Sequence, residues 1–158
     1  MKKVVLISGA STGLGRSIAK LLSTKDFKVY GTSRNPKKYS DFEGIELLKY
    51  DLTSFKQSKR LVEKVLSIES KIDVLINNAG SGFTGPIEEI SIKDAKQLFD
   101  TNFFGHIDLM QAVLPSMRAN KNGLILNITS IAGYNNIPFG SIYSASKYSM
   151  ECLGASLN

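Results

Sequence analysis

The feature that most constrains the fold is an alternation of short apolar runs with segments of helical periodicity. Five runs rich in β-branched residues cover residues 3–7, 28–32, 44–50, 73–77 and 123–128. Apolar residues recur at helical spacing around residues 14–22 and 61–66, across 92–119, and from 142 to the last residue. Strands that are apolar on both faces indicate a parallel sheet covered by helices on both sides. Right-handed crossovers then make this α/β sheet doubly wound.

Length indicates one domain over residues 1–158, and the doubly wound pattern makes it a domain of the Rossmann type. The apolar start leads directly into a glycine-rich turn, which favours a buried strand over a signal peptide. No apolar run approaches the ~18 residues of a membrane span. A single cysteine, Cys152, excludes an internal disulfide framework and is typical of a reducing compartment, so we expect a cytoplasmic protein.

The net charge of +6 does not by itself indicate a nucleic-acid partner. The basic residues are dispersed, with mild clusters only at 37–38 and 59–60, and there is no RNA-binding signature. We therefore expect an anionic small ligand and no nucleic acid. We also expect no metal site, because His106, the only histidine, has no partner visible in the sequence.

A glycine-rich turn, "SGASTGLG" at 8–15, follows the first strand and precedes a helix. Gly9 can make a tight turn, Gly13 can let backbone amides approach a phosphate, and Gly15 can let the helix pack closely. The amino terminus of the helix attracts negative charge. An ordinary loop is the alternative, but the strand-to-helix context favours phosphate binding.

The end of the second strand indicates which dinucleotide binds. "GTSRNPKK" at 31–38 has no carboxylate, although proteins that prefer NAD usually hold the ribose hydroxyls with one there. Arg34 offers a guanidinium fork suited to a phosphate, and Ser11 and Ser33 offer hydroxyl groups. We therefore expect NADP(H), with NADPH preferred over NADH. The alternative is a solvated basic loop.

Further polar residues fall near the ends of the later strands. "NNAG" closes the fourth strand at 77–80, Asn102 interrupts the long helical pattern, and Ser130 follows the fifth strand. Tyr143 and Lys147 lie four residues apart, on one face of a helix. Each has an ordinary explanation as a turn, cap or surface residue when taken alone. Their combination in register predicts a functional site.

With these motifs, the chain from Lys3 onward resembles the classical short-chain dehydrogenase/reductase family. The glycine turn matches with Ser8 in place of the usual threonine, "DLT" at 51–53 matches the adenine-contacting element, and "NNAG" matches outright. The resemblance implies a catalytic tetrad of Asn102, Ser130, Tyr143 and Lys147. The cofactor-binding residues expected from the turn, the strand ends and the resemblance are Gly9, Ser11, Thr12, Gly13, Leu14, Gly15, Ser33, Arg34, Asp51, Leu52, Asn78, Ala79 and Gly80, together with Tyr143 and Lys147.

The expected reaction is hydride transfer between NADP(H) and an alcohol or ketone. A neighbouring ammonium stabilises a phenolate, so Tyr143 can exchange a proton with the reacting oxygen while Ser130 hydrogen-bonds the same atom. The resemblance implies that Lys147 also holds the nicotinamide ribose and that Asn102 positions a water. Residues 80–89 resemble members that act on steroids, retinoids or other bulky substrates. The alternatives are an inert nucleotide-binding fragment or interaction module, and a flavin-binding domain.

The resemblance also implies that the fold is incomplete at its carboxyl end. Full-length members continue with further strands, a substrate-closing loop and a segment that contacts the nicotinamide amide. We therefore expect the fifth strand at a sheet edge and a final helix without a cap. Members commonly assemble through two long helices, here 92–119 and 142 onward, so we expect a homodimer or homotetramer for the full-length protein.

Overall fold

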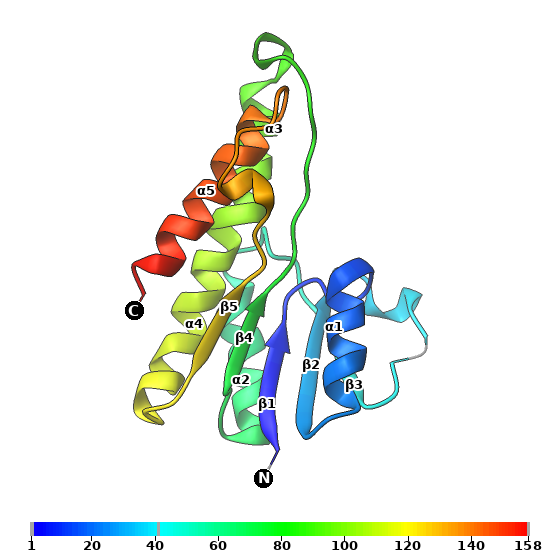
Figure 1. The fold of residues 1–158 in the computed structure, drawn as a ribbon. Coiled ribbons are helices and arrows are strands. Elements are labelled where there is room, and N and C mark those ends of the chain that lie inside the picture. The colour runs from blue at the N-terminus through cyan, green and yellow to red at the C-terminus, as the bar shows by residue number, and fades with distance from the viewer. Residues whose placement is uncertain (1, 41, 158) are drawn as a thin grey trace.

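A five-stranded parallel sheet forms the centre of the computed structural model, which describes residues 2–40 and 42–157 (Figure 1). The strands are β1 (Lys3–Ile7), β2 (Phe27–Ser33), β3 (Ile45–Lys49), β4 (Val74–Asn77) and β5 (Leu124–Asn127). Their order across the sheet is β3-β2-β1-β4-β5, and every neighbouring pair is parallel. The winding reverses between β1 and β4, so the predicted doubly wound sheet is confirmed.

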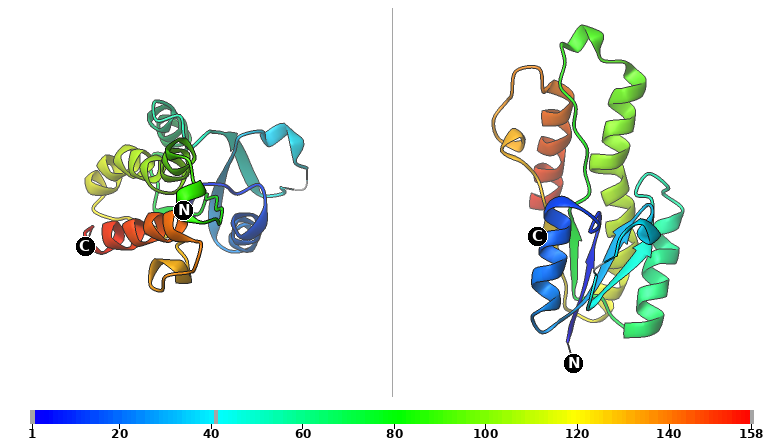
Figure 2. Two further views of the ribbon diagram at one scale, coloured as in Figure 1. Left: turned by 90° about the horizontal axis from the view of Figure 1, so that it is seen from above. Right: turned by 90° about the vertical axis from the view of Figure 1, so that its right-hand side faces the viewer.

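Helices cover both faces of this sheet (Figure 2). They are α1 (Gly13–Ser23), α2 (Gln57–Glu69), α3 (Ile92–Phe99), α4 (Gly105–Ala119) and α5 (Ser141–Ala155). The alternation of side chains along β1 builds two cores: Val4 and Leu6 pack with α2 and α4, whereas Val5 and Ile7 pack with α1. In both views of Figure 2, α5 lies on the same side of the sheet as α1.

The long helix predicted across 92–119 is interrupted. A π-helical turn, Asp100–Phe104, separates α3 from α4, and the amide of Gly105 donates to the carbonyl of Asp100, five residues earlier. Asn102 lies in this turn and is fully buried. Single π turns within helices are frequent at functional sites. α3 and the first half of α5 rise beyond the carboxyl ends of the strands (Figure 1). Residues of both helices line a cleft there.

The last helix also differs from the expectation, because α5 ends at Ala155 instead of continuing through Leu157. The amide and the hydroxyl of Ser156 both donate to the carbonyl of Cys152, at 3.2 and 2.8 Å. We expected the helix to run to Asn158 and to have no cap there, but Asn158 lies outside the described residues. β5 is an edge strand, as expected, and Leu124 and Leu126 are exposed on it.

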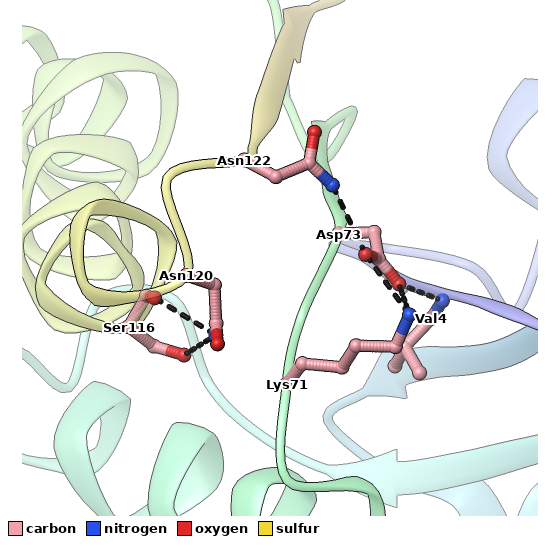
Figure 3. Close-up of polar contacts among 6 residues, drawn as sticks. All are labelled: Val4, Lys71, Asp73, Ser116, Asn120 and Asn122. Atoms are coloured by element: carbon pink, nitrogen blue, oxygen red, sulfur yellow. Dashed lines mark hydrogen bonds and ion pairs between the residues drawn. The ribbon is translucent and has the colours of Figure 1, made fainter. Parts of the chain in front are cut away.

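A buried carboxylate joins three segments at the opposite end of the sheet (Figure 3). Asp73 accepts the amide of Val4 at 2.7 Å, the ammonium of Lys71 at 3.0 Å and the side-chain amide of Asn122 at 3.3 Å. Although burial opposes ionisation, these three donors together hold the pKa of Asp73 below its usual range. The starts of β1 and β4 and the loop before β5 are therefore fixed together, away from the cleft.

Candidate functional site

A cleft of about 1490 Å³ opens beyond the carboxyl ends of the strands. In a doubly wound sheet this is the edge at which ligands bind. Every residue predicted to bind the cofactor lines it, from the glycine-rich turn, the ends of β2, β3 and β4, and α5. Of the predicted catalytic residues, Tyr143 and Lys147 line the cleft. Asn102 and Ser130 are not among its lining residues: Asn102 is fully buried, whereas Ser130 is partly exposed.

The glycine-rich turn passes too close to the β4 turn for larger side chains. Gly9 has a φ of +67°, and a Cβ atom there would lie 2.9 Å from the backbone of Ala79. A Cβ atom on Gly15 would lie 2.3 Å from the side-chain nitrogen of Asn78 and 2.4 Å from the carbonyl oxygen of Gly9. Both distances are shorter than any van der Waals contact. This close approach leaves the amino terminus of α1 open to the cleft, where its amides and dipole favour a phosphate.

Ser8 and Asn78 lock the two turns together. The Ser8 hydroxyl oxygen accepts the amides of Asn78 and Ala79 at 2.9 and 3.0 Å. The side-chain amide of Asn78 donates in return to the carbonyls of Ser8 and Gly9 at 3.0 and 3.1 Å. The serine that stands in place of the usual threonine therefore supplies the hydroxyl that this junction uses.

The end of β2 gives the cleft a basic side. Ser33 closes β2, and its hydroxyl oxygen accepts the amide of Asn35 at 3.2 Å. Arg34 and Lys38 are exposed and line the cleft. Asp51 follows β3, and its carboxylate accepts the amide and the hydroxyl of Thr53 in the same loop, at 3.0 and 2.8 Å. The guanidinium and ammonium groups suit a phosphate at this end.

His106 supports the β4 turn from behind. Its side chain is buried in α4, with Nε2 2.8 Å from the carbonyl oxygen of Ala79. Because a carbonyl only accepts, Nε2 carries the proton. Burial, with a smaller contribution from the nearby charge of Lys147, lowers the pKa of His106 to about 4, so the ring is neutral at pH 7. This partner could not be predicted from the sequence, because it is a backbone carbonyl and not a side chain.

Lys147 and Tyr143 share one face of α5, as their spacing predicts. Lys147 is buried, and its ammonium donates to the carbonyl of Ile128 at 3.2 Å. Burial lowers the pKa of Lys147. The same nitrogen lies 5.8 Å from the centre of the Tyr143 ring. A Cβ atom on Gly82 would lie 3.2 Å from that ring, so the loop after β4 packs flush against Tyr143.

Both polar atoms of the Asn102 side chain form hydrogen bonds within the protein. Its oxygen accepts the amide of Ser81 at 2.9 Å, while its nitrogen donates to the carbonyl of Ser81 at 2.9 Å and to the Ser146 hydroxyl at 3.0 Å. The Ser146 hydroxyl donates to the carbonyl of Tyr143 at 2.7 Å. Asn102 therefore joins the loop after β4 to α5. Ser81 and Ser146 are site residues that sequence reasoning missed, because they contact Asn102 from 21 and 44 positions away and belong to no motif.

Ser130 begins the short 3-10 turn Ile131–Gly133, which follows β5. Its hydroxyl oxygen accepts the amide of Ala132 at 3.1 Å, and its carbonyl accepts the amide of Gly133 at 2.8 Å. A hydroxyl that accepts through one lone pair still has its own proton to donate. Ser130 can therefore donate to an oxygen atom while its position is fixed by the turn.

Two kinds of feature are absent from the described part of the chain. Between residues 2 and 157, with residue 41 left aside, no helix is both long and apolar enough to cross a bilayer. The same residues contain no cluster of three or more His, Cys, Asp or Glu side chains that could hold a metal ion.

Comparison with known proteins gives concordant matches. The family model described as short chain dehydrogenase matches residues 3–158. The 3-ketodihydrosphingosine reductase of Bacteroides thetaiotaomicron is 40% identical over 149 residues, which is 94% of this chain and 55% of that protein. Human retinol dehydrogenase 8 is 39% identical over 158 residues, with 94% of this chain and 51% of that protein covered. The chain thus spans about half the length of these curated relatives.

Solved structures agree with these matches. A short-chain dehydrogenase from Streptomyces avermitilis superposes with a TM-score of 0.96 at 33% identity, covering 99% of this chain and 60% of that one. The structure of ElxO with NADP bound gives a TM-score of 0.90 at 31% identity, covering 99% of this chain and 68% of that one.

Proposed function

Because the chain belongs to the short-chain dehydrogenase family, we propose that it forms the cofactor-binding and catalytic part of an NADP(H)-dependent oxidoreductase that interconverts an alcohol and a ketone. One observation carries this proposal: a single cleft collects the glycine-rich turn, Arg34, the β4 turn, Tyr143 and Lys147. These groups come from distant parts of the sequence, and a dinucleotide with a reacting carbonyl beside it accounts for all of them.

The residues present fit a nicotinamide dinucleotide. The amino terminus of α1, held close to the β4 turn by Gly9 and Gly15, suits the pyrophosphate. Asp51 and Leu52 would border the adenine, and Asn78–Gly80 with Lys147 would border the nicotinamide ribose. When bound, such a cofactor supplies the hydride for reduction of a ketone or takes it up from an alcohol.

The protein's own groups handle the proton. In reduction, the Tyr143 hydroxyl gives its proton to the carbonyl oxygen, and Ser130 donates a hydrogen bond to the same oxygen. The buried ammonium of Lys147 stabilises the phenolate that forms on Tyr143. Because burial lowers the pKa of Lys147, this group releases a proton more readily than an exposed lysine does. Asn102 holds Ser81 and α5 together, so it maintains the spacing on which these transfers depend.

The preference for NADPH rests on charge. Arg34 and Lys38 line the cleft at the end of β2 and would face the 2′-phosphate of the adenine ribose. The structures of ElxO and of a metagenomic short-chain oxidoreductase, both solved with NADP, support this assignment.

A bulky apolar substrate fits the far end of the cleft. Phe83, Ile90 and Leu98 line the wall formed by the loop after β4 and by α3. Two relatives are named for 3-ketodihydrosphingosine and for retinol. We assign this chain the same broad class of substrate, a large lipophilic alcohol or ketone. A cytoplasmic location and assembly as a homodimer or homotetramer through α4 and α5 stay predictions.

The test is turnover by the protein with NADPH and a panel of bulky and small ketones. Ketone-dependent loss of NADPH absorbance supports the proposal, whereas NADPH binding without oxidation supports the inert nucleotide-binding alternative. The Tyr143→Phe variant supplies the matched control. It should lower kcat by about 1000-fold, since it removes the proton donor, while NADPH affinity stays within about twofold. An equal loss of both quantities would remove Tyr143 from the proton-transfer role.

A further inference from the structure

Glu151 binds both ends of the segment that carries Ser130. It lies on α5 one helical turn beyond Lys147 and two turns beyond Tyr143, so the three side chains share one stripe of the helix. One carboxylate oxygen accepts the hydroxyl of Thr129, directly before Ser130. The other accepts the hydroxyl of Tyr134 at 2.7 Å, directly after the 3-10 turn. Ser130 lies between these two attachment points.

The rest of the segment is held against the same helix. A Cβ atom on Gly133 would lie 3.2 Å from the Glu151 side chain and 3.3 Å from the carbonyl of Lys147, so the backbone there packs directly on α5. The Tyr148 hydroxyl donates to the carbonyl of Tyr134. The ammonium of Lys147 donates to the carbonyl of Ile128, the residue before Thr129. Residues 128–134 are thus attached to α5 on either side of Ser130.

We propose that Glu151 is a positioning residue that clamps residues 129–134 to α5 and so fixes Ser130 relative to Tyr143 and Lys147. The inference rests on the proposed function for its catalytic meaning. A carboxylate suits this task because each of its oxygens accepts a hydrogen bond from a neutral hydroxyl, and bonds to a charged acceptor are stronger than neutral ones. Catalytic geometry must be held within about 0.5 Å, and residues that support the reacting groups provide that precision.

The contacts predict a graded series of variants. Glu151→Ala removes both hydrogen bonds. Glu151→Gln keeps an oxygen that can accept from Thr129, while its amide nitrogen can only donate to the Tyr134 hydroxyl oxygen, so this variant loses the charged acceptor and reverses one bond. Tyr134→Phe removes that bond alone. Glu63→Ala is the control, because Glu63 is an exposed carboxylate on α2 whose ion pair with Lys59 is long, at 3.9 Å.

The first measurement is amide hydrogen exchange by NMR, which needs no reaction. In Glu151→Ala, the amides of Ala132 and Gly133, which bond to Ser130, should exchange about tenfold faster or more, because local opening becomes easier. Exchange at Asn78 and Ala79 should not change. Glu151→Gln and Tyr134→Phe should fall between Glu151→Ala and the wild type. Wild-type exchange at Ala132 and Gly133 in Glu151→Ala would overturn the clamp.

The second measurement is steady-state kinetics with NADPH and a ketone substrate. Glu151→Ala should lower kcat by about tenfold or more with an unchanged Kd for NADPH, and Glu151→Gln should recover part of the loss. A proportional loss of kcat and NADPH affinity would mean general damage and would reject the positioning role. If the wild-type protein shows no turnover at all, the proposed function fails, and the exchange data still decide whether Glu151 holds the Ser130 segment.

Discussion

At the scale of single residues, Arg34 tests the assignment of the cofactor. Its guanidinium is exposed at the cleft directly after β2, where a carboxylate would favour NADH by binding the ribose hydroxyls. Arg34→Asp replaces the attraction for a 2′-phosphate with repulsion. The ratio of kcat/KM for NADPH to that for NADH should therefore fall by about 100-fold. A ratio that stays constant would exclude Arg34 from the phosphate site, and Lys37→Asp, three residues further on, controls for the change in net charge.

His106 predicts how stability depends on pH. Its pKa is about 4 in the folded protein, against 6.5 for an ordinary histidine. Between these values the unfolded chain binds a proton that the folded protein excludes, so stability is complete above pH 6.5 and falls as the pH decreases. We expect a loss of about 2 kcal/mol in the free energy of unfolding between pH 7 and pH 5.

The variant His106→Gln isolates this effect. Glutamine can still donate to the carbonyl of Ala79 but does not titrate, and the chain has no other histidine. Urea denaturation of both proteins at several pH values gives the comparison. The variant should show a flat profile between pH 7 and pH 5. The same decline in both proteins would assign it to other groups.

At the scale of elements, the contact between the β1–α1 turn and the β4 turn leaves no space for a side chain at Gly15. Gly15→Ala would place a methyl group 2.3 Å from Asn78, whose side chain ties the two turns together. We expect NADPH affinity to fall by about tenfold or more and the free energy of unfolding to decrease by about 1–3 kcal/mol. Isothermal titration and urea denaturation measure the two quantities.

The matched control for this prediction is Gly85→Ala. A Cβ atom at Gly85 would have Ile90 as its nearest neighbour, at 3.9 Å, which is an ordinary contact. This variant should keep wild-type stability. If both variants were equally stable, the close approach at Gly15 would carry no energetic weight.

Some features at the scale of elements could be predicted from the sequence, and others could not. The strands and helices could be predicted within a few residues, because apolar periodicity reports which faces are buried. The predicted cofactor-binding residues all line the cleft, and they were predicted from glycine spacing, from strand ends and, for Asp51 and Leu52, from the family resemblance. The π turn at Asp100–Phe104 could not be predicted, since the contacts that accompany it, from Asn102 to Ser81 and to Ser146, join residues 21 and 44 positions apart. The partners of His106 and Glu151 could not be predicted for the same reason. One is a backbone carbonyl and the others are hydroxyl groups far away in the sequence, and neither produces a local sequence pattern.

At the scale of the whole molecule, the two ends of the sheet have different tasks. The carboxyl ends of the strands form the cleft, whereas the opposite ends are tied together by Asp73 (Figure 3). This carboxylate binds Val4, which is 69 positions away from it in the chain, and Asn122, which is 49 positions away. Separation of binding and stability in this way is usual for sheets whose loops at one end carry the function. Changes at Asp73 should therefore alter stability without altering the cleft.

The variant Asp73→Asn tests this separation. It removes the charge that the amide of Val4 and the ammonium of Lys71 bind, so the free energy of unfolding at pH 7 should fall by about 1–3 kcal/mol. Because the pKa of Asp73 is lowered in the folded protein, its stabilising effect is present above pH 3.8 and lost as the pH falls through the lower folded value. The difference between the two proteins should shrink accordingly in acid. Asp26→Asn, an exposed site with the same charge change, should match the wild type. A large loss of NADPH affinity in Asp73→Asn, measured well below its unfolding midpoint, would show that the two ends of the sheet are coupled.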